Sequence, residues 1–221
     1  MRNDSTPAPL NVNRMSLEEL GLRSGMALQL RRLVEGASKT EGQLYGAVEG
    51  KGVMIGPRGP QGEDTGLAEG EVCIVRGFTG QYEFSFVSKV LQTYEKPFVY
   101  ALLAYPAKVD ASQVRQSMRT KTSWPVQAQA GGVTVDGMLV DLSPQGAMIT
   151  TPLPVAAVGT AIALRIRAMV EDEPTTLELK ASVCHSNRAP DDSGHFIGMA
   201  FTGLDPQSKL VLHYLTKTPQ R

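Results

Sequence analysis

The sequence predicts an all-β protein whose short strands form two small barrels or sandwiches. Apolar residues recur in short runs, most of which alternate with polar residues at a period of two, as strands with one buried face do. Glycine-rich turns separate these runs, and the pattern begins again after a segment, 105–113, that lacks it. With 42% hydrophobic and 20% charged residues, the 221-residue chain has the composition of a globular protein with buried cores.

A short helix is expected before the strands of the first barrel. Ser16 and Glu19 have the spacing of a capping box, and Met15 and Leu20 are placed as its hydrophobic staple. This helix is expected to end at one of the next two glycines. The strands of the first barrel are expected at Leu28/Leu30, Leu44, Val53/Ile55, Val72/Ile74, Tyr82/Phe84/Phe86 and 98–103.

The second half of the chain repeats the strand pattern and ends in one helix. Asp205 and Pro206 supply an N-cap and a proline at the first helical position. Leu210, Leu212 and Leu215 are expected to face the core from this helix, which ends near residue 217. The strands of the second barrel are expected at Val126/Ala128, Val133/Val135, 138–142, 146–150, Ile162/Leu164/Ile166, 177–183 and 196–201.

A domain boundary is expected between the two sets of strands. The segment from Tyr105 to Gln113 contains a proline followed by small and polar residues, which is typical of a linker. The sequence therefore predicts a disordered leader at 1–14, a barrel of split-barrel type at 15–106, a linker at 107–114 and a second barrel at 115–221.

Charge and hydropathy exclude several classes of protein. The chain carries 22 Lys and Arg against 22 Asp and Glu, and dividing it after residue 111 gives 12 basic against 13 acidic residues, then 10 against 9. Proteins that bind nucleic-acid polymers through their phosphates normally carry a basic excess on one domain, so this class is disfavoured. No run approaches the roughly 18–20 apolar residues that span a bilayer, and the polar start lacks the apolar core of a secretory signal. With two cysteines that read as buried, reduced thiols, a cytoplasmic protein is expected.

No motif in the sequence argues for catalysis, a metal or a cofactor. The glycines from Gly46 to Gly52 with Lys51 fail the phosphate-loop pattern, because the spacing is one residue short and no Ser or Thr follows the lysine. The three histidines have no carboxylate or thiolate at metal-ligand spacing. No Gly-x-Ser-x-Gly elbow occurs. A binding protein is therefore expected instead of an enzyme.

Two short motifs stand out at the start of the second barrel. Arg115 and Arg119 have Arg-x-x-x-Arg spacing, and 22 residues after Arg119 the motif Asp-x-Ser-x-x-Gly runs from Asp141 to Gly146. In this order, in an all-β domain with a terminal helix, they resemble the signature of PilZ domains over about residues 115–214. The resemblance implies a small β-barrel that binds the bacterial second messenger cyclic di-GMP through Arg115, Arg119, Asp141, Ser143 and Gly146.

These residue types suit a cyclic dinucleotide on chemical grounds. A guanidinium group can donate two parallel hydrogen bonds to a phosphate or to guanine O6 and N7, and it can also stack on a base. Arg115 and Arg119 could each make these contacts. Asp141 can accept hydrogen bonds from guanine N1–H and N2–H2, which adenine lacks in this arrangement. Ser143 offers a hydroxyl for a phosphate or a turn, and Gly146 permits close approach of backbone to a purine, including through a positive φ.

Each motif taken alone also has a plainer explanation. Two arginines four residues apart are common on a solvated surface, and Asp141 and Ser143 would then form a polar turn between strands, with Gly146 starting the next. The first motif also departs from many PilZ relatives, because Gln116, Ser117 and Met118 occupy places where those relatives have an arginine or an aromatic residue.

The resemblance implies a cyclic di-GMP receptor with two domains, arranged as in the YcgR family of flagellar brake proteins. It implies restraint of flagellar motility through contact with motor proteins, in the cytoplasm or at the flagellar basal body. A related alternative is control of exopolysaccharide or another surface trait, and a further one is a ligand-free PilZ adaptor. An alternative from another class is a flavin-binding split barrel in the N-terminal half, and hence an oxidoreductase.

Overall fold

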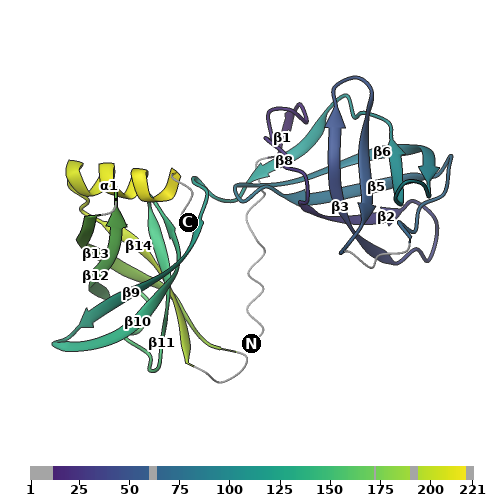
Figure 1. The fold of residues 1–221 in the computed structure, drawn as a ribbon. Coiled ribbons are helices and arrows are strands. Elements are labelled where there is room, and N and C mark those ends of the chain that lie inside the picture. The colour runs from purple at the N-terminus through teal and green to yellow at the C-terminus, as the bar shows by residue number, and fades with distance from the viewer. Residues whose placement is uncertain (1–11, 60–63, 172, 190–193, 218–221) are drawn as a thin grey trace. The chain divides into compact units, whose positions relative to one another are not determined.

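The computed structural model describes residues 12–59, 64–171, 173–189 and 194–217. The chain divides into two compact units, residues 1–116 and 117–221 (Figure 1). Each unit is a β-barrel with its own hydrophobic core. The prediction of an all-β protein with two small barrels is therefore confirmed.

The N-terminal unit is a six-stranded barrel extended by two short strands. Its strands are β1 (Val12–Met15), β2 (Ala27–Arg32), β3 (Lys39–Val48), β4 (Gly52–Pro57), β5 (Val72–Phe78), β6 (Tyr82–Tyr94), β7 (Tyr100–Leu103) and β8 (Val109–Gln113). The sheet has the order β1-β8-β6-β5-β2-β3-β4-β7, and β6 also pairs with β7, which closes the ring of strands β2 to β7. Closure is possible because β6 is long: Tyr82–Ser85 pair with β8, whereas Val90–Tyr94 pair with β7 along the same edge.

Strands β1 and β8 correct two of the expected boundaries. Strand β8 lies where the linker 107–114 is expected, and it pairs with both β6 and β1, so this segment is part of the first barrel's sheet. Val109 and Ala111 are buried in the N-terminal core, which explains why this short run of small residues forms a strand. Residues 12–14, expected in a disordered leader, belong to β1, and residues 1–11 lie outside the described part of the chain.

The expected N-terminal helix is wrong, although its capping box is present. The Ser16 N–H donates to Glu19 Oε2 at 2.6 Å, and the Glu19 N–H donates to Ser16 Oγ at 3.3 Å. The Ser16 N–H and the Ser16 hydroxyl, the latter at 2.9 Å, both donate to the Glu19 carboxylate and hold its pKa below the ordinary value. The segment 17–21 forms only a turn, because Gly21, at φ 59°, ends it after a single Gly21 N–H to Glu18 C=O bond.

The C-terminal unit is a closed barrel of six strands. They are β9 (Thr120–Ala130), β10 (Val133–Ser143), β11 (Gly146–Thr151), β12 (Ala161–Val170), β13 (Glu173–Arg188) and β14 (His195–Thr202), in the ring order β10-β11-β14-β13-β12-β9. All neighbours are antiparallel, and alternate residues face the core, as in the fully alternating buried and exposed residues at 161–169 of β12.

One helix, α1 (Pro206–Lys217), packs on this barrel (Figure 1). Asp205 is its N-cap, since its carboxylate accepts the Ser208 N–H at 2.9 Å and the Ser208 hydroxyl at 2.6 Å. Leu212 and Leu215 are buried in the core as predicted. Leu210 is 71% exposed, so the expected inward orientation is wrong for this residue, because the helical period carries it to the opposite face.

The two cysteines differ in their surroundings. Cys73 is buried, as expected, whereas Cys184 is exposed at a register shift between Val183 and His185 in β13. The buried positions of β13 are Leu177, Leu179, Ala181 and Val183, so the period of two turns Cys184 outward and its expected burial is wrong. No helix within the described residues is long and apolar enough to cross a membrane.

Candidate functional site

The second motif lies on β10 just after a β-bulge. The register of β10 shifts between Leu139 and Asp141 on both of its neighbours, β11 and β9. Leu139 and Leu142 are both buried in the core, which a strand of strict period two would not allow. The bulge therefore brings Asp141 and Ser143 together on the face opposite Leu142.

Asp141 is a buried carboxylate with an unsatisfied oxygen. The residue is 6% exposed. Its Oδ1 atom has no hydrogen-bond partner among the described residues, and its Oδ2 atom lies 3.6 Å from a guanidinium nitrogen of Arg119. A buried polar atom without a partner costs about 1–3 kcal/mol, so such atoms are rare unless they have another use.

Arg119 lies directly before β9 and next to Asp141. The 3.6 Å separation is longer than the roughly 2.7–2.9 Å of a charge-assisted hydrogen bond, so the pair is an ion pair without a hydrogen bond. The Arg119 side chain is 36% exposed. Its donors therefore remain available to an anion while its charge offsets that of Asp141.

Ser143 closes the β10–β11 hairpin. Its Oγ accepts the Gly146 N–H at 3.1 Å and donates to the Gly146 carbonyl at 3.1 Å. In the structure Ser143 therefore forms the polar turn between strands that is the plainer explanation of this motif. Contact of the Ser143 O–H with a phosphate would require the hydroxyl to leave the Gly146 carbonyl.

Gly146 is required by close packing and not by an unusual backbone angle. It pairs with Ala200 of β14, and a Cβ at this position would lie 2.2 Å from the Met199 carbonyl oxygen. Its φ lies outside the left-handed region, so the expected positive φ is wrong. Because β14 occupies the space that a side chain at this position would need, only glycine fits here, and no side chain projects from this end of the hairpin.

Arg115 lies in the other compact unit. The boundary between the units falls after Gln116, which divides the Arg-x-x-x-Arg motif. The Arg115 guanidinium carbon lies 4.9 Å from the ring centroid of Phe78, a residue of β5. The C-terminal barrel therefore brings together Arg119, Asp141, Ser143 and Gly146, and the N-terminal unit holds Arg115.

Two features of this region have no signal in the sequence. The Ser117 hydroxyl donates to the Gln145 side-chain carbonyl, which ties the middle of the first motif to the β10–β11 turn. A row of paired residues also leads from Asp141 through Met148 and Gly198 to His185. A Cβ at Gly198 would lie 1.9 Å from His185 Cε1, so the imidazole rests on the glycine and presents a flat ring. Strand pairing alone creates this row.

Among residues 12–59, 64–171, 173–189 and 194–217, no group of three or more His, Cys, Asp or Glu side chains is placed to hold a metal ion.

The comparisons with known proteins identify the C-terminal half. Residues 113–217 match the family model of the PilZ domain. The match begins at the end of β8 and ends with α1, so it contains both motifs and the whole second barrel. A comparison with curated proteins gives no match.

Several solved structures resemble the chain over most of its length. The inhibitor of motility MotI/DgrA of Bacillus subtilis is 17% identical, with a TM-score of 0.46 over 86% of this chain and 94% of its own. YcgR from Escherichia coli, solved in complex with c-di-GMP, is 16% identical, with a TM-score of 0.46 over 86% of this chain and 82% of its own. MrkH of K. pneumonia, also solved with c-di-GMP, is 12% identical, with a TM-score of 0.47 over 90% and 87%.

Proposed function

Because residues 113–217 of this chain form a PilZ domain, we propose that the protein is a receptor for cyclic di-GMP. The ligand carries two phosphates and two guanines, and the residues of both motifs offer matching groups. Arg119 and Arg115 supply guanidinium forks for phosphate or for guanine O6 and N7. Asp141 accepts from the N1–H and N2–H2 edge of guanine. The protein binds and signals, and no chemical step is part of the proposal.

The observation that carries this proposal is the unsatisfied oxygen of Asp141. A buried carboxylate oxygen without a donor costs free energy that a ligand with N–H groups would recover. Guanine offers two such donors side by side on one edge, whereas adenine offers a single amino group next to an acceptor. The neighbouring Arg119 keeps its donors for the anionic part of the same ligand.

The surface around Asp141 supports a flat ligand. The hairpin from Ser143 to Gly146 has no bulky side chain at its ends, and the Phe201 N–H of β14 donates to the Gln145 carbonyl of its turn at 2.8 Å. Beyond Met148 and Gly198, the His185 ring offers a face on which a base can stack. In this proposal the hairpin and His185 contact the flat face of the ligand, and Asp141 alone hydrogen-bonds with the edge of guanine.

The proposed output is restraint of flagellar motility through contact with motor proteins, in the cytoplasm and at the flagellar basal body. This part rests on the two-barrel organisation, which resembles the YcgR family, and control of exopolysaccharide is the alternative output of the same receptor. Arg115 and Arg119 fall on opposite sides of the boundary between the two compact units, so the proposal includes a change in interdomain orientation on ligand binding. We propose that the hinge for this change lies at the unit boundary, residues 116 and 117, because residues 109–113 of the expected linker form β8.

Calorimetric titration tests the proposed ligand. Cyclic di-GMP is expected to give a saturable binding heat, and cyclic di-AMP at the same concentration is expected to give none. Arg165→Ala is a matched control for site variants, because Arg165 also pairs with a carboxylate, Glu178 at 2.7 Å, on the exposed face of the same barrel. Binding of both dinucleotides with equal affinity would contradict the assignment of Asp141 as the reader of guanine.

A further inference from the structure

The turn between β5 and β6 forms hydrogen bonds with residues 114–116, where the arginine motif begins. The Gln81 carbonyl accepts the N–H of Val114 at 2.9 Å and that of Arg115 at 3.1 Å. The Gln81 side-chain amide donates to the Gln116 carbonyl at 3.0 Å. The backbone of residues 114–116 is therefore fixed to the N-terminal barrel up to the boundary of the two units.

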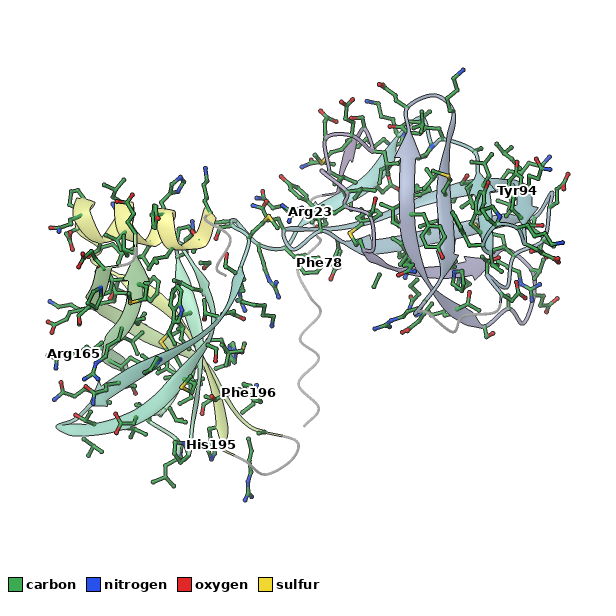
Figure 2. The ribbon with its side chains drawn as sticks, in the orientation of Figure 1. Arg23, Phe78, Tyr94, Arg165, His195 and Phe196 are labelled. Atoms are coloured by element: carbon green, nitrogen blue, oxygen red, sulfur yellow. The ribbon has the colours of Figure 1, made fainter. Side chains whose placement is uncertain are left out.

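The same turn orients the Arg115 side chain through Phe78. Phe78 is the last residue of β5, and Figure 2 shows its side chain at the end of the N-terminal barrel. The Arg115 guanidinium carbon lies 4.9 Å from its ring centroid, which is the geometry of a cation–π contact. Phe78 is 38% exposed, so the contact forms at the surface and is open to a ligand.

Stacking on Phe78 leaves the hydrogen-bonding capacity of Arg115 intact. The five N–H donors of a guanidinium point outward in its plane, and a ring against one face does not occupy them. In the described part of the chain, no ion pair or hydrogen bond joins the Arg115 guanidinium to another residue. Phe78 thus holds the Arg115 side chain in place while the guanidinium N–H donors stay available. Part of the entropy cost of ordering this side chain is therefore met before an anion binds.

We infer that Phe78 is a positioning residue for Arg115, through which the N-terminal barrel contributes to the affinity of the PilZ domain for cyclic di-GMP. The inference rests on the proposed function and deepens it, because it names the element by which binding reaches the first barrel. Arg115 is one of the proposed ligand-binding residues, so Phe78 acts on binding through the side chain that it holds.

A double-mutant cycle in calorimetric titrations tests the role of Phe78. Phe78→Leu keeps an apolar side chain and removes the aromatic face, and it is expected to weaken cyclic di-GMP binding about two- to five-fold, the range of an exposed cation–π contact. In the Arg115→Ala background the same substitution is expected to change nothing. Phe98→Leu is the matched control, because Phe98 is an exposed phenylalanine of the same barrel and is expected to bind like wild type.

The outcomes separate this inference from the function on which it rests. Wild-type protein that gives no binding heat overturns the proposed function and the inference together. If wild type binds and Phe78→Leu binds equally well or more tightly, only the role of Phe78 is overturned. An equal loss with and without Arg115 also overturns it, because Phe78 would then act by another route. Unchanged melting temperatures of the four proteins of the cycle and of Phe98→Leu show that the effects arise in binding.

Discussion

Arg115 and Arg119 are four positions apart in the chain, yet they lie in different compact units and have different partners. Arg115 stacks on an aromatic ring, has its backbone held by Gln81 and pairs with no carboxylate in the described residues. Arg119 lies 3.6 Å from the buried carboxylate of Asp141. A single sequence motif therefore supplies one arginine to each barrel.

This difference assigns the two arginines different tasks. Arg119 and Asp141 both belong to the C-terminal barrel's part of the proposed site, so they are expected to supply most of the affinity and the choice of base. Arg115 belongs to the N-terminal barrel, so its engagement is expected to couple binding to the arrangement of the two units. The experiments below test this division of tasks.

Arg119→Ala is expected to have the largest effect on binding. It removes a charge-assisted contact to the ligand, and cyclic di-GMP affinity is expected to fall by about 1.5–3 kcal/mol. The barrel itself is expected to stay folded, since Arg119 lies outside the core. Calorimetry with Arg165→Ala as control measures the loss. Wild-type affinity in Arg119→Ala would remove Arg119 from the site.

Asp141→Ala is expected to reduce both affinity and selectivity. Loss of a good base-edge contact is worth about 1–3 kcal/mol of discrimination, so the preference for cyclic di-GMP over cyclic di-AMP is expected to shrink. The substitution also removes a buried carboxylate oxygen that has no partner, so the melting temperature is expected not to fall by more than a few degrees. Competition titrations with both dinucleotides measure the ratio. An unchanged ratio would show that another group reads the base.

The stoichiometry is expected to be one cyclic di-GMP per protomer. Val114, the residue before Arg115, has no guanidinium to stack on a second ligand molecule, and its N–H is already held by Gln81. The calorimetric ratio at protein concentrations well above the dissociation constant measures this directly. A ratio near two would point to a stacked pair of ligands.

The two barrels also differ in the accessibility of their cysteines, and this difference is expected to have the smallest effect. Burial, together with the nearby carboxylate of Glu71, raises the pKa of the Cys73 thiol to about 11, so Cys73 is almost wholly protonated at pH 8 and the core shields it. Cys184 is exposed. A thiol reagent at pH 8 is expected to modify one thiol per folded chain and two in denaturant. Two rapid modifications of the folded protein would contradict the packing of the first barrel.

Much of the fold could be predicted from local patterns. Period-two alternation such as Leu28/Leu30 or Ile162/Leu164/Ile166 located strands in both barrels, and Asp205 with Pro206 marked the start of α1. Strands β1 and β8 could not be predicted in this way because both are short. Strand β1 pairs with β8 and β8 pairs with β6, and local sequence does not encode such pairing. The capping box at Ser16 formed without a helix because Gly21 ends the turn at once.

The sequence names candidate residues for the site, and their arrangement comes only from the structure. The motifs pointed to Asp141 and Arg119, which the structure places 3.6 Å apart. The unit boundary within the first motif, the contact of Arg115 with Phe78 and the row that ends at His185 depend on contacts between distant segments. Spacing along the chain carries no information on such contacts.

Small-angle scattering of wild type and Arg115→Ala, each with and without saturating cyclic di-GMP, tests the division of tasks most directly. Both proteins are expected to bind ligand, since Arg119 and Asp141 remain in the variant. The wild-type profile is expected to change on binding, because the ligand draws the two units into one arrangement, whereas the profile of Arg115→Ala is expected to stay the same. A wild-type profile that does not change, or an Arg115→Ala profile that changes as much as that of wild type, would contradict the account.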